Sequence, residues 1–585
     1  MEDNNLWKRH LLNLVTQVVL ALYVFWKSIG KHSANLLLAG SFVFVAGIIK
    51  YVERTWALKS GSQKSIESSD RYKIKGTDDK ISEKEEEEVS EEEEGTDTYH
   101  SKLVDGLLQD SLDSMADVFQ FLSDRSLLNP ERIKIRKRRQ IVPEIERTIW
   151  KASVQLGMIY DDVYTKSFVL RTWTGAILRC ISQAAVIVAF VLFHVSDKVT
   201  YGKADIAITY SLFVGCLFLE VCSMVVSMMS PWTWAWFKNK NCGALASFFR
   251  FVLRCEIGYP EMKQRWPNLI GQYSMYSWLF DKDQQRRKYS QRIMILLRKL
   301  FVGLFHVGKK KLFWMSKLLD AEYMDLDSRI LRRVVQEIRD LPFGFKIDEP
   351  SEWKNIGNLL KQTHKRFVVD FGQYIAELHL YTERFLEKCA SSKSYMKKIS
   401  SDEDLVLMDE VCSKLSKYMM YLLVTQPSLL PLSISAGATL NIHQLPTDDI
   451  ESDTESSRYD VFNLDPTNES SEPHESSKEL ARMWMRLLIY AAGKSRTALH
   501  VAQLGRGGEL ITFLWLVMSH SGIGESHGTR IQLTQNDAGA ENRAGVTKLY
   551  GFIFPSEDQK LGADSWWSES EIERPRKRKR NTTDE

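Results

Sequence analysis

The sequence predicts an all-α fold: a helical membrane protein with two transmembrane hairpins and a cytosolic helical domain, joined by a disordered acidic linker and ending in a disordered tail. Three observations predict it: four long apolar runs, positive charge outside the hairpin turns, and helical periodicity with few strand signals in the C-terminal half. The 585 residues suffice for several domains. The 44% share of hydrophobic residues excludes a wholly disordered chain, and the negative mean hydropathy excludes a chain that is mostly membrane.

Four apolar runs are candidate membrane spans, since a helix needs about 20 residues to cross about 30 Å of hydrocarbon. They are Leu11–Trp26, Ala34–Val52, Ala176–Val195 and Ile206–Met229. The first is short and spans only if its flanking residues join it, and buried core helices are the alternative for all four. Tryptophans at the run ends suit interfacial belts; these are Trp26, Trp173, Trp232, Trp234 and Trp236.

The runs form two hairpins with short turns, Ser28–Ser33 and Ser196–Asp205. Most Lys and Arg residues lie beyond the outer ends of the hairpins, although Lys27 and Lys31 flank the first turn. By the positive-inside rule, both termini and all large segments face the cytosol. We therefore expect an integral, multi-pass protein of the endomembrane system or plasma membrane, with the bulk of the chain cytosolic.

Three polar side chains, Arg179, Gln183 and Glu220, lie inside the third and fourth runs, where such groups are costly. Arg179 is close enough to its helix start to reach the headgroups. Glu220 matches the depth of Gln183 better than that of Arg179, which predicts a hydrogen bond that pairs the two helices. The alternative is a proton or ion site.

The chain divides into a first membrane hairpin (1–58), an acidic linker (59–102), an amphipathic helix with the second hairpin (103–235), a basic juxtamembrane helical region (236–345), a cytosolic helical domain (346–530) with a mobile insert (434–475), and a disordered tail (531–585). The evidence for the linker is the acidic run Asp78–Asp97, which contains twelve acidic residues and only two basic ones, Lys80 and Lys84. Such a block repels itself and stays solvated.

The segment Lys282–Lys317 mixes cations with large apolar residues, which suits a helix lying on an anionic leaflet. Ordinary helical packing with a basic face and nucleic-acid binding are the alternatives; tethering to a membrane argues against the latter, and we expect membrane lipids and unidentified proteins as partners. The candidate lipid contacts are Arg286, Arg287, Lys288, Arg292, Arg298, Lys299, Lys309, Lys310 and Lys311.

Helical periodicity marks Trp353–Leu386 and Leu405–Val424. Ser476 with Glu479 forms a capping-box pattern that predicts a helix from there to about Leu499. Leu510–Met518 is too short to span a membrane and predicts a buried helix.

Chemical motifs are few. The chain has no GxxxxGK[ST] loop, no HExxH motif and no CxxC pair among its seven cysteines, so we expect no cofactor, no metal site and no catalytic residues. The turn Gly505, Arg506, Gly507 and Gly508 precedes a helix, so its backbone N–H groups are a candidate anion-binding turn. A tight structural turn, with Glu509 favoured by the helix dipole, is the alternative. For His379 we expect a histidine with satisfied hydrogen bonds.

Several stretches resemble long signatures of a plant membrane-protein family. Residues 415–423, LSKYMMYLL, and 504–516, LGRGGELITFLWL, resemble signatures of its C-terminal domain of unknown function 594. Residues 44–58, FVAGIIKYVERTWAL, with Val52 in place of the pattern's glycine, are similar to a signature of its N-terminal multi-pass domain of unknown function 4220. Gln272, Tyr273 and Ser274 are similar to its AQYSL step.

The resemblance implies a plant multi-pass membrane protein with no known activity. It also implies further spans ahead of residues 2–12, EDNNLWKRHLL, so the N-terminus looks truncated relative to the family. We expect a non-enzymatic scaffold or regulatory interaction protein. The alternatives are a transporter or channel subunit, or a lipid-modifying enzyme at the membrane surface.

Overall fold

The computed structural model describes part of the chain. The described residues are 2–28, 34–62, 65, 106–122, 145–197, 201–228, 230–239, 244–245, 247–248, 251, 269–276, 321–340, 355–356, 359, 370–393, 395, 397, 402–433, 435–436, 473–507 and 509–520. The predicted acidic block, the basic segment Lys282–Lys317, most of the insert 434–475 and the tail lie outside them.

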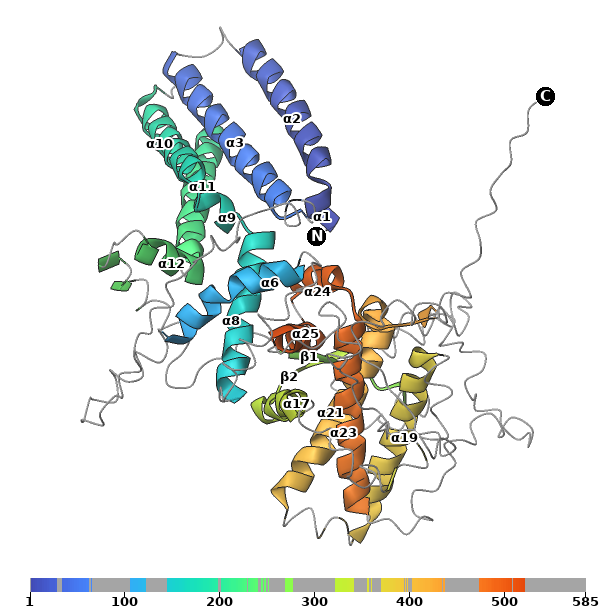
Figure 1. Ribbon diagram of the computed structural model, residues 1–585. Helices are drawn as coiled ribbons and strands as arrows, with labels where there is room; N and C mark the ends of the chain where they lie inside the picture. Colours follow the sequence, from blue (N-terminus) through green and yellow to red (C-terminus); the bar gives the residue numbers. More distant parts are fainter. Residues whose placement is uncertain are drawn as a thin grey trace, which may run out of the picture.

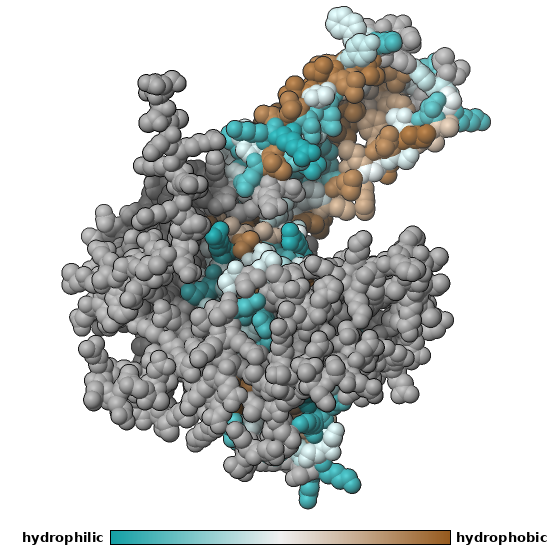
Figure 2. All heavy atoms as spheres, turned by 90° about the vertical axis from the view of Figure 1, so that its right-hand side faces the viewer, coloured by the Kyte–Doolittle hydropathy of each residue, from teal (hydrophilic) through white to brown (hydrophobic). Residues whose placement is uncertain are grey.

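Four of the described helices are long and apolar enough to cross a membrane, as expected from the four runs. They are α2 (Trp7–Ser28), α3 (Ala34–Ser60), α10 (Trp173–Val195) and α11 (Lys203–Met228). The short first run reaches spanning length because its flanks on both sides continue the helix. The four helices project from the rest of the molecule as a separate bundle (Figure 1). Hydrophobic residues cover much of the bundle's surface (Figure 2), which suits contact with lipid.

The closest packing in the bundle joins α3 to α10, which belong to different hairpins. Small residues make this approach possible: Ala46 of α3 is buried against Ala185 and Val186 of α10. The hydroxyl of Ser182 also donates to the Ala46 carbonyl at 3.5 Å. Small side chains let helix backbones come close in a membrane, so this pair is the central contact of the bundle.

A junction connects the bundle to the other helices. It consists of α1 (Glu2–Asn5), α8 (Ile145–Tyr164), α9 (Ser167–Leu170) and α12 (Pro231–Asn239), with 106–113 and α6 (Met115–Leu122) alongside. Helix α8 is buried along most of its length, because it packs on α3 as well as on helices of the C-terminal half.

The expectation that all the tryptophans lie in interfacial belts is wrong for Trp232 and Trp234. Both are buried in the main hydrophobic core, whereas Trp26 and Trp173 are exposed. The indole N–H of Trp232 donates to the Met158 carbonyl of α8 at 3.2 Å. A partner from α8 therefore satisfies this indole, and α12 packs on protein.

The C-terminal half is a helical core with a small sheet. Its helices are α17 (Ser328–Asp340), α19 (Phe371–Ser391), α21 (Glu403–Thr425), α23 (Pro473–Lys494), α24 (Thr497–Leu504) and α25 (Leu510–His520), with a 3-10 turn at Pro427–Leu429. Side chains Asp370 and Asp402 cap α19 and α21 by accepting from backbone N–H groups. Helix α25 is buried from Leu510 to Ser519, which confirms the predicted buried helix.

The sheet was not expected. Strands β1 (Leu269–Gln272) and β2 (Glu322–Asp325) pair antiparallel, with Gly271 opposite Tyr323, inside the region 236–345 that the sequence predicts as helical. Helix α21 supplies the reason, because its Lys414 carbonyl accepts from the Gln272 side chain and its Lys417 carbonyl from the Tyr273 backbone. Contacts distant in sequence thus fix β1 as extended chain.

The predicted capping box is also replaced. Helix α23 begins at Pro473, three residues before Ser476. The Glu479 carboxylate instead accepts from the backbone N–H groups of Asn355 and Ile356, and from the Asn355 side chain, at 2.9 to 3.2 Å. Glu479 therefore holds a distant segment onto α23.

Candidate functional site

The first candidate site is a charged node centred on Glu220 of α11. One carboxylate oxygen of Glu220 lies 2.6 Å from the Lys50 ammonium of α3, and the other lies 3.3 Å from the Arg179 guanidinium of α10. The Gln183 amide donates to the second oxygen at 3.4 Å. Arg179 also donates to the Ser223 hydroxyl at 3.0 Å. Three membrane helices thus converge on a single half-buried carboxylate.

A second ion pair continues from this node towards the junction. Glu53 of α3 is buried, and one of its carboxylate oxygens lies 3.7 Å from the ammonium of Lys166, which precedes α9. Among the described groups, the other oxygen of Glu53 and the Nε of Arg179 are buried without a hydrogen-bond partner. The two ion-pair groups together hold three cations and two carboxylates.

The structure brings together all three predicted intramembrane residues and adds a fourth that the sequence analysis missed. Gln183 lies within reach of Glu220, as its depth predicts, and so does Arg179. Lys50 is the missed partner. It lies ten residues before the end of α3, or about 15 Å, while Glu220 lies eight residues before the end of α11, or about 12 Å. Lys50 and Glu220 therefore lie at similar depths in the membrane, so residue counting across both hairpins predicts that they can pair.

The second candidate site surrounds Glu509, which directly precedes α25. The Tyr418 hydroxyl donates to one of its carboxylate oxygens at 3.2 Å, and the Tyr421 hydroxyl donates to the other, also at 3.2 Å. The Gln503 amide donates at 3.4 Å, and Tyr418 in turn accepts from the backbone N–H of Ile511 at 3.1 Å. Burial raises the pKa of Glu509 to about 7, because none of these donors carries a charge that offsets desolvation.

Comparison with known families gives two matches. Residues 1–278 match the domain of unknown function DUF4220, and residues 469–523 match the protein family of unknown function DUF594. The chain has the DUF4220–DUF594 architecture. No curated protein and no solved structure matches it. The chain is therefore a membrane protein of unknown function, and the four apolar helices all lie within its DUF4220 region.

The family signatures meet around Glu509. The DUF594 region supplies Glu509, and α21, which lies between the two matched regions, supplies Tyr418 and Tyr421. The DUF4220 region supplies Gly271 of β1, which lies under the Tyr421 ring; a Cβ at this position would come within 2.3 to 2.4 Å of ring atoms. Tyr323 of β2 closes the group, with its hydroxyl 3.1 Å from that of Tyr421. Through α21, these residues connect β1 of the DUF4220 region to Glu509 of the DUF594 region.

The signature near the N-terminus has an equivalent role at the junction. The buried Asn4 amide donates to the carbonyls of Gly61 and Val163 at 3.0 and 2.8 Å. The Lys59 ammonium lies 5.2 Å from the centre of the Trp7 ring. These contacts attach the start of the DUF4220 region to the end of α3 and the end of α8.

The predicted anion-binding turn is packed against protein on one side. Gly505 contacts the ring of Tyr164, where a Cβ would come within 2.8 Å, and Gly507 has a φ of 110°, which glycine adopts readily. Arg506 donates to the Gln426 side chain at 3.2 Å. Gly508 lies outside the described residues, as do all nine candidate lipid contacts.

His379 has the satisfied environment that the sequence analysis expects. Its Nε2 accepts from the backbone N–H of Met275 at 3.2 Å, so its Nδ1 donates to the Ser416 hydroxyl at 2.8 Å. Burial lowers the pKa of His379 to about 3, so the ring is neutral at physiological pH. In the described part of the chain, no three His, Cys, Asp or Glu side chains are grouped so as to hold a metal ion.

Proposed function

We propose that the protein is a non-enzymatic scaffold or regulatory interaction protein that holds its helical core at a fixed position on a membrane. The observation that carries this proposal is the junction around α8. This helix packs on α3 of the membrane bundle and also on α17 and α25 of the helical core. A scaffold has to present its surface in a defined place, and a continuous buried helix between anchor and core meets that requirement.

Polar contacts reinforce the junction. Arg171, which follows α9, forms an ion pair with the buried Asp162 of α8, and its guanidinium lies 4.4 Å from the centre of the Trp232 ring of α12. The Ser230 hydroxyl donates to Asp161 at 2.5 Å. Fixed donors and aromatic faces restrict relative motion of the elements they join, which supports a rigid coupling.

The polar groups of the helical core also support a structural role. The Glu509 carboxyl, His379 and Asp409 are each hydrogen-bonded to neighbouring side chains; Asp409 accepts from the Tyr395 hydroxyl at 2.7 Å. Groups committed to such contacts hold helices together. We therefore propose that interaction with proteins and with the anionic cytosolic leaflet, rather than chemistry, is the role of the parts outside the bundle, in a plant endomembrane or plasma membrane.

A transporter or channel subunit is the second candidate, and the charged residues of the bundle favour it. Transport sites in membranes use polar groups between helices. Lys50 of α3, with Glu53 and Lys166 nearer the junction, extends the polar region beyond Arg179, Gln183 and Glu220, which the sequence predicts. A lipid-modifying enzyme has no comparable observation in its favour.

Reconstitution of the purified full chain separates the two candidates. Proteoliposomes that contain a pH-sensitive dye report proton flux, and potassium electrodes report ion release. The scaffold proposal predicts flux equal to that of empty vesicles for the wild type and for Glu220→Gln. Flux through the wild type that disappears in folded Glu220→Gln would contradict it and support transport.

Proximity labelling in native membranes tests the scaffold directly. A labelling enzyme fused to the full chain should mark a reproducible set of neighbours. That set should change when Arg171→Ala weakens the junction, while Arg329→Ala, which removes an exposed local ion pair with Asp327 outside the junction, should leave it unchanged. Identical sets for all three chains would contradict the claim that the junction positions the core.

A further inference from the structure

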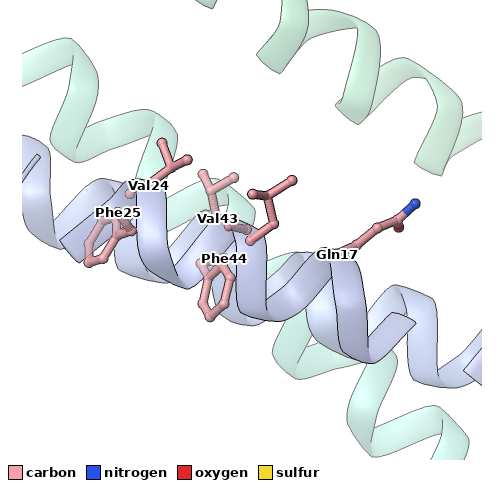
Figure 3. A pocket seen from close by; sticks show the side chains of 8 residues that line it. Gln17, Val24, Phe25, Val43 and Phe44 are labelled. Carbon is pink, nitrogen blue, oxygen red and sulfur yellow. The ribbon is translucent and has the colours of Figure 1, made fainter. Parts of the chain in front are cut away.

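Helix α2 has one face that the described chain leaves open. It is the most peripheral helix of the bundle, and its apolar side chains are exposed along its length, with Leu20 62% and Val24 58% exposed. A groove separates it from α3 and is lined by Leu20, Ala21 and Val24 on one side and by Gly40, Val43 and Phe44 on the other (Figure 3). Exposed apolar residues are ordinary in a membrane, so they alone identify no partner.

Gln17 is the exception in this groove. It is exposed, and it lies ten residues after Trp7 and eleven before Ser28, so it is about 15 Å from either end of α2 and near the middle of the bilayer. Figure 3 shows its amide projecting away from α2 and α3. Within the described part of the chain, its amide has no hydrogen-bond partner. The neighbouring Thr16, by contrast, donates to the Leu12 carbonyl of its own helix at 3.1 Å.

An unpaired amide at this depth requires a polar partner. Glutamine is too short to reach the headgroups from the middle of a span, and lipid tails offer neither donor nor acceptor. Gln17 makes no hydrogen bond within its own helix among the described residues, and polar groups of other helices commonly satisfy side-chain amides in membranes. The exposed face of α2 is therefore suited to packing against another protein helix.

The same face carries a pattern for helix pairing. Asn13, Gln17, Leu20 and Val24 follow one another at intervals of four, three and four residues, which is the spacing of the seam between two packed helices. Asn13 is exposed like Gln17 and lies one turn away on the same stripe. The seam thus combines two amides with two apolar residues.

We propose that α2 pairs with α2 of a second copy of this chain, with Gln17 hydrogen-bonded to Gln17 of the partner subunit. An amide both donates and accepts, so two identical amides facing each other across a twofold axis satisfy each other. The apolar residues Leu20 and Val24 pack on the same stripe of the second copy. A different partner requires a polar group of its own at the matching depth, whereas a second copy brings that group by symmetry.

Subunit counting in bilayers tests the proposal. The full chain, labelled with one fluorophore and reconstituted at low density, should bleach in two steps. Asn13→Leu combined with Gln17→Leu should weaken dimerisation at least tenfold, which corresponds to about 1.4 kcal/mol. Thr16→Val is the matched control and should leave dimerisation unchanged, because the Thr16 hydroxyl bonds within its own helix.

Photo-crosslinking identifies the occupant without relying on a destabilising variant. A photoreactive phenylalanine analogue at Leu20 of the full chain should give a product of twice the chain mass, 67.6 kDa for one copy, in native membranes. A product that contains another protein instead, single-step bleaching of the wild type, or unchanged dimerisation in the double variant would overturn the proposal.

Discussion

Glu220 and Glu509 are each held by side chains from more than one helix, but the charge of those partners differs. In the membrane bundle, Glu220 lies between two cations, Lys50 and Arg179, with the Gln183 amide as a neutral addition. In the helical core, the donors to Glu509 among the described residues are all neutral: the hydroxyls of Tyr418 and Tyr421 and the Gln503 amide. The comparison teaches that Glu220 stabilises the membrane bundle as an anion, whereas Glu509 stabilises the helical core as a neutral acid.

The largest effect is expected for Glu220→Leu. Removal of the carboxylate leaves Lys50 and Arg179 without their shared counter-charge in a low-dielectric environment, which should cost about 3 kcal/mol. The measurement is the fraction of full chain that remains monodisperse after heating in detergent. If cation desolvation is the cause, combining Glu220→Leu with Lys50→Met should recover part of the loss, and a double variant less stable than either single variant would refute that cause.

A pH titration probes Glu509. Because the folded chain has a Glu509 pKa of about 7, against 4.5 as the ordinary value, its contribution to stability is complete below pH 4.5 and is lost as the pH rises through 7. The loss approaches about 3 kcal/mol, at 1.36 kcal/mol for each pKa unit. Burial also raises the pKa of Asp409, which adds a loss in the same direction.

Glu509→Gln should therefore reduce, but not abolish, the fall in unfolding free energy between pH 5 and pH 8. Denaturant titrations of the full chain followed by tryptophan fluorescence would measure it. Glu403→Gln, at an exposed position in the first turn of α21, is the control and should keep the wild-type slope. Identical pH profiles for both variants would show that Glu509 is already ionised at pH 5.

A substitution at Gly271 tests how tightly Tyr421, one of the donors to Glu509, is packed. Gly271→Ala would place a Cβ within 2.4 Å of the Tyr421 ring, so the ring or β1 has to move, at a cost of roughly 1–3 kcal/mol. Gly106→Ala is the control, because its Cβ would meet nothing within 4 Å. Equal thermal midpoints for the two variants would mean that the contact between β1 and Tyr421 is not tight.

The smallest effect is expected where the two regions are joined. Asn4→Ala leaves the carbonyls of Gly61 and Val163 without the amide that donates to both, which should cost about 1 kcal/mol. Arg9→Ala, at an exposed position in the first turn of α2, is the control. Limited proteolysis near residue 61 should accelerate only in Asn4→Ala, and equal rates would remove Asn4 from the account of the junction.

The sequence predicted the four membrane helices and α25, because length and apolar composition are local properties. It also placed Arg179, Gln183 and Glu220 in adjacent helices through residue counting. Lys50 was missed because it belongs to the other hairpin, and residue counting within one hairpin does not reveal its contact with Glu220. Strand β1 was missed because contacts with α21 hold it in place, and these are far apart in the sequence: Gln272 and Lys414 are 142 positions apart. The spacing of Ser476 and Glu479 predicts a local cap for the same reason, since the actual partners of Glu479, Asn355 and Ile356, are distant in sequence.

The most direct test of the contrast between the two glutamates compares two isosteric substitutions, Glu220→Gln and Glu509→Gln. Each is made singly in the full chain, and the thermal midpoint of unfolding is measured at pH 8. Each removes a negative charge while keeping the size and a hydrogen-bonding head. Glu220→Gln should lower the thermal midpoint, because two cations lose their counter-charge, and Glu509→Gln should raise it, because a buried anion is removed. Shifts in the same direction would contradict the account.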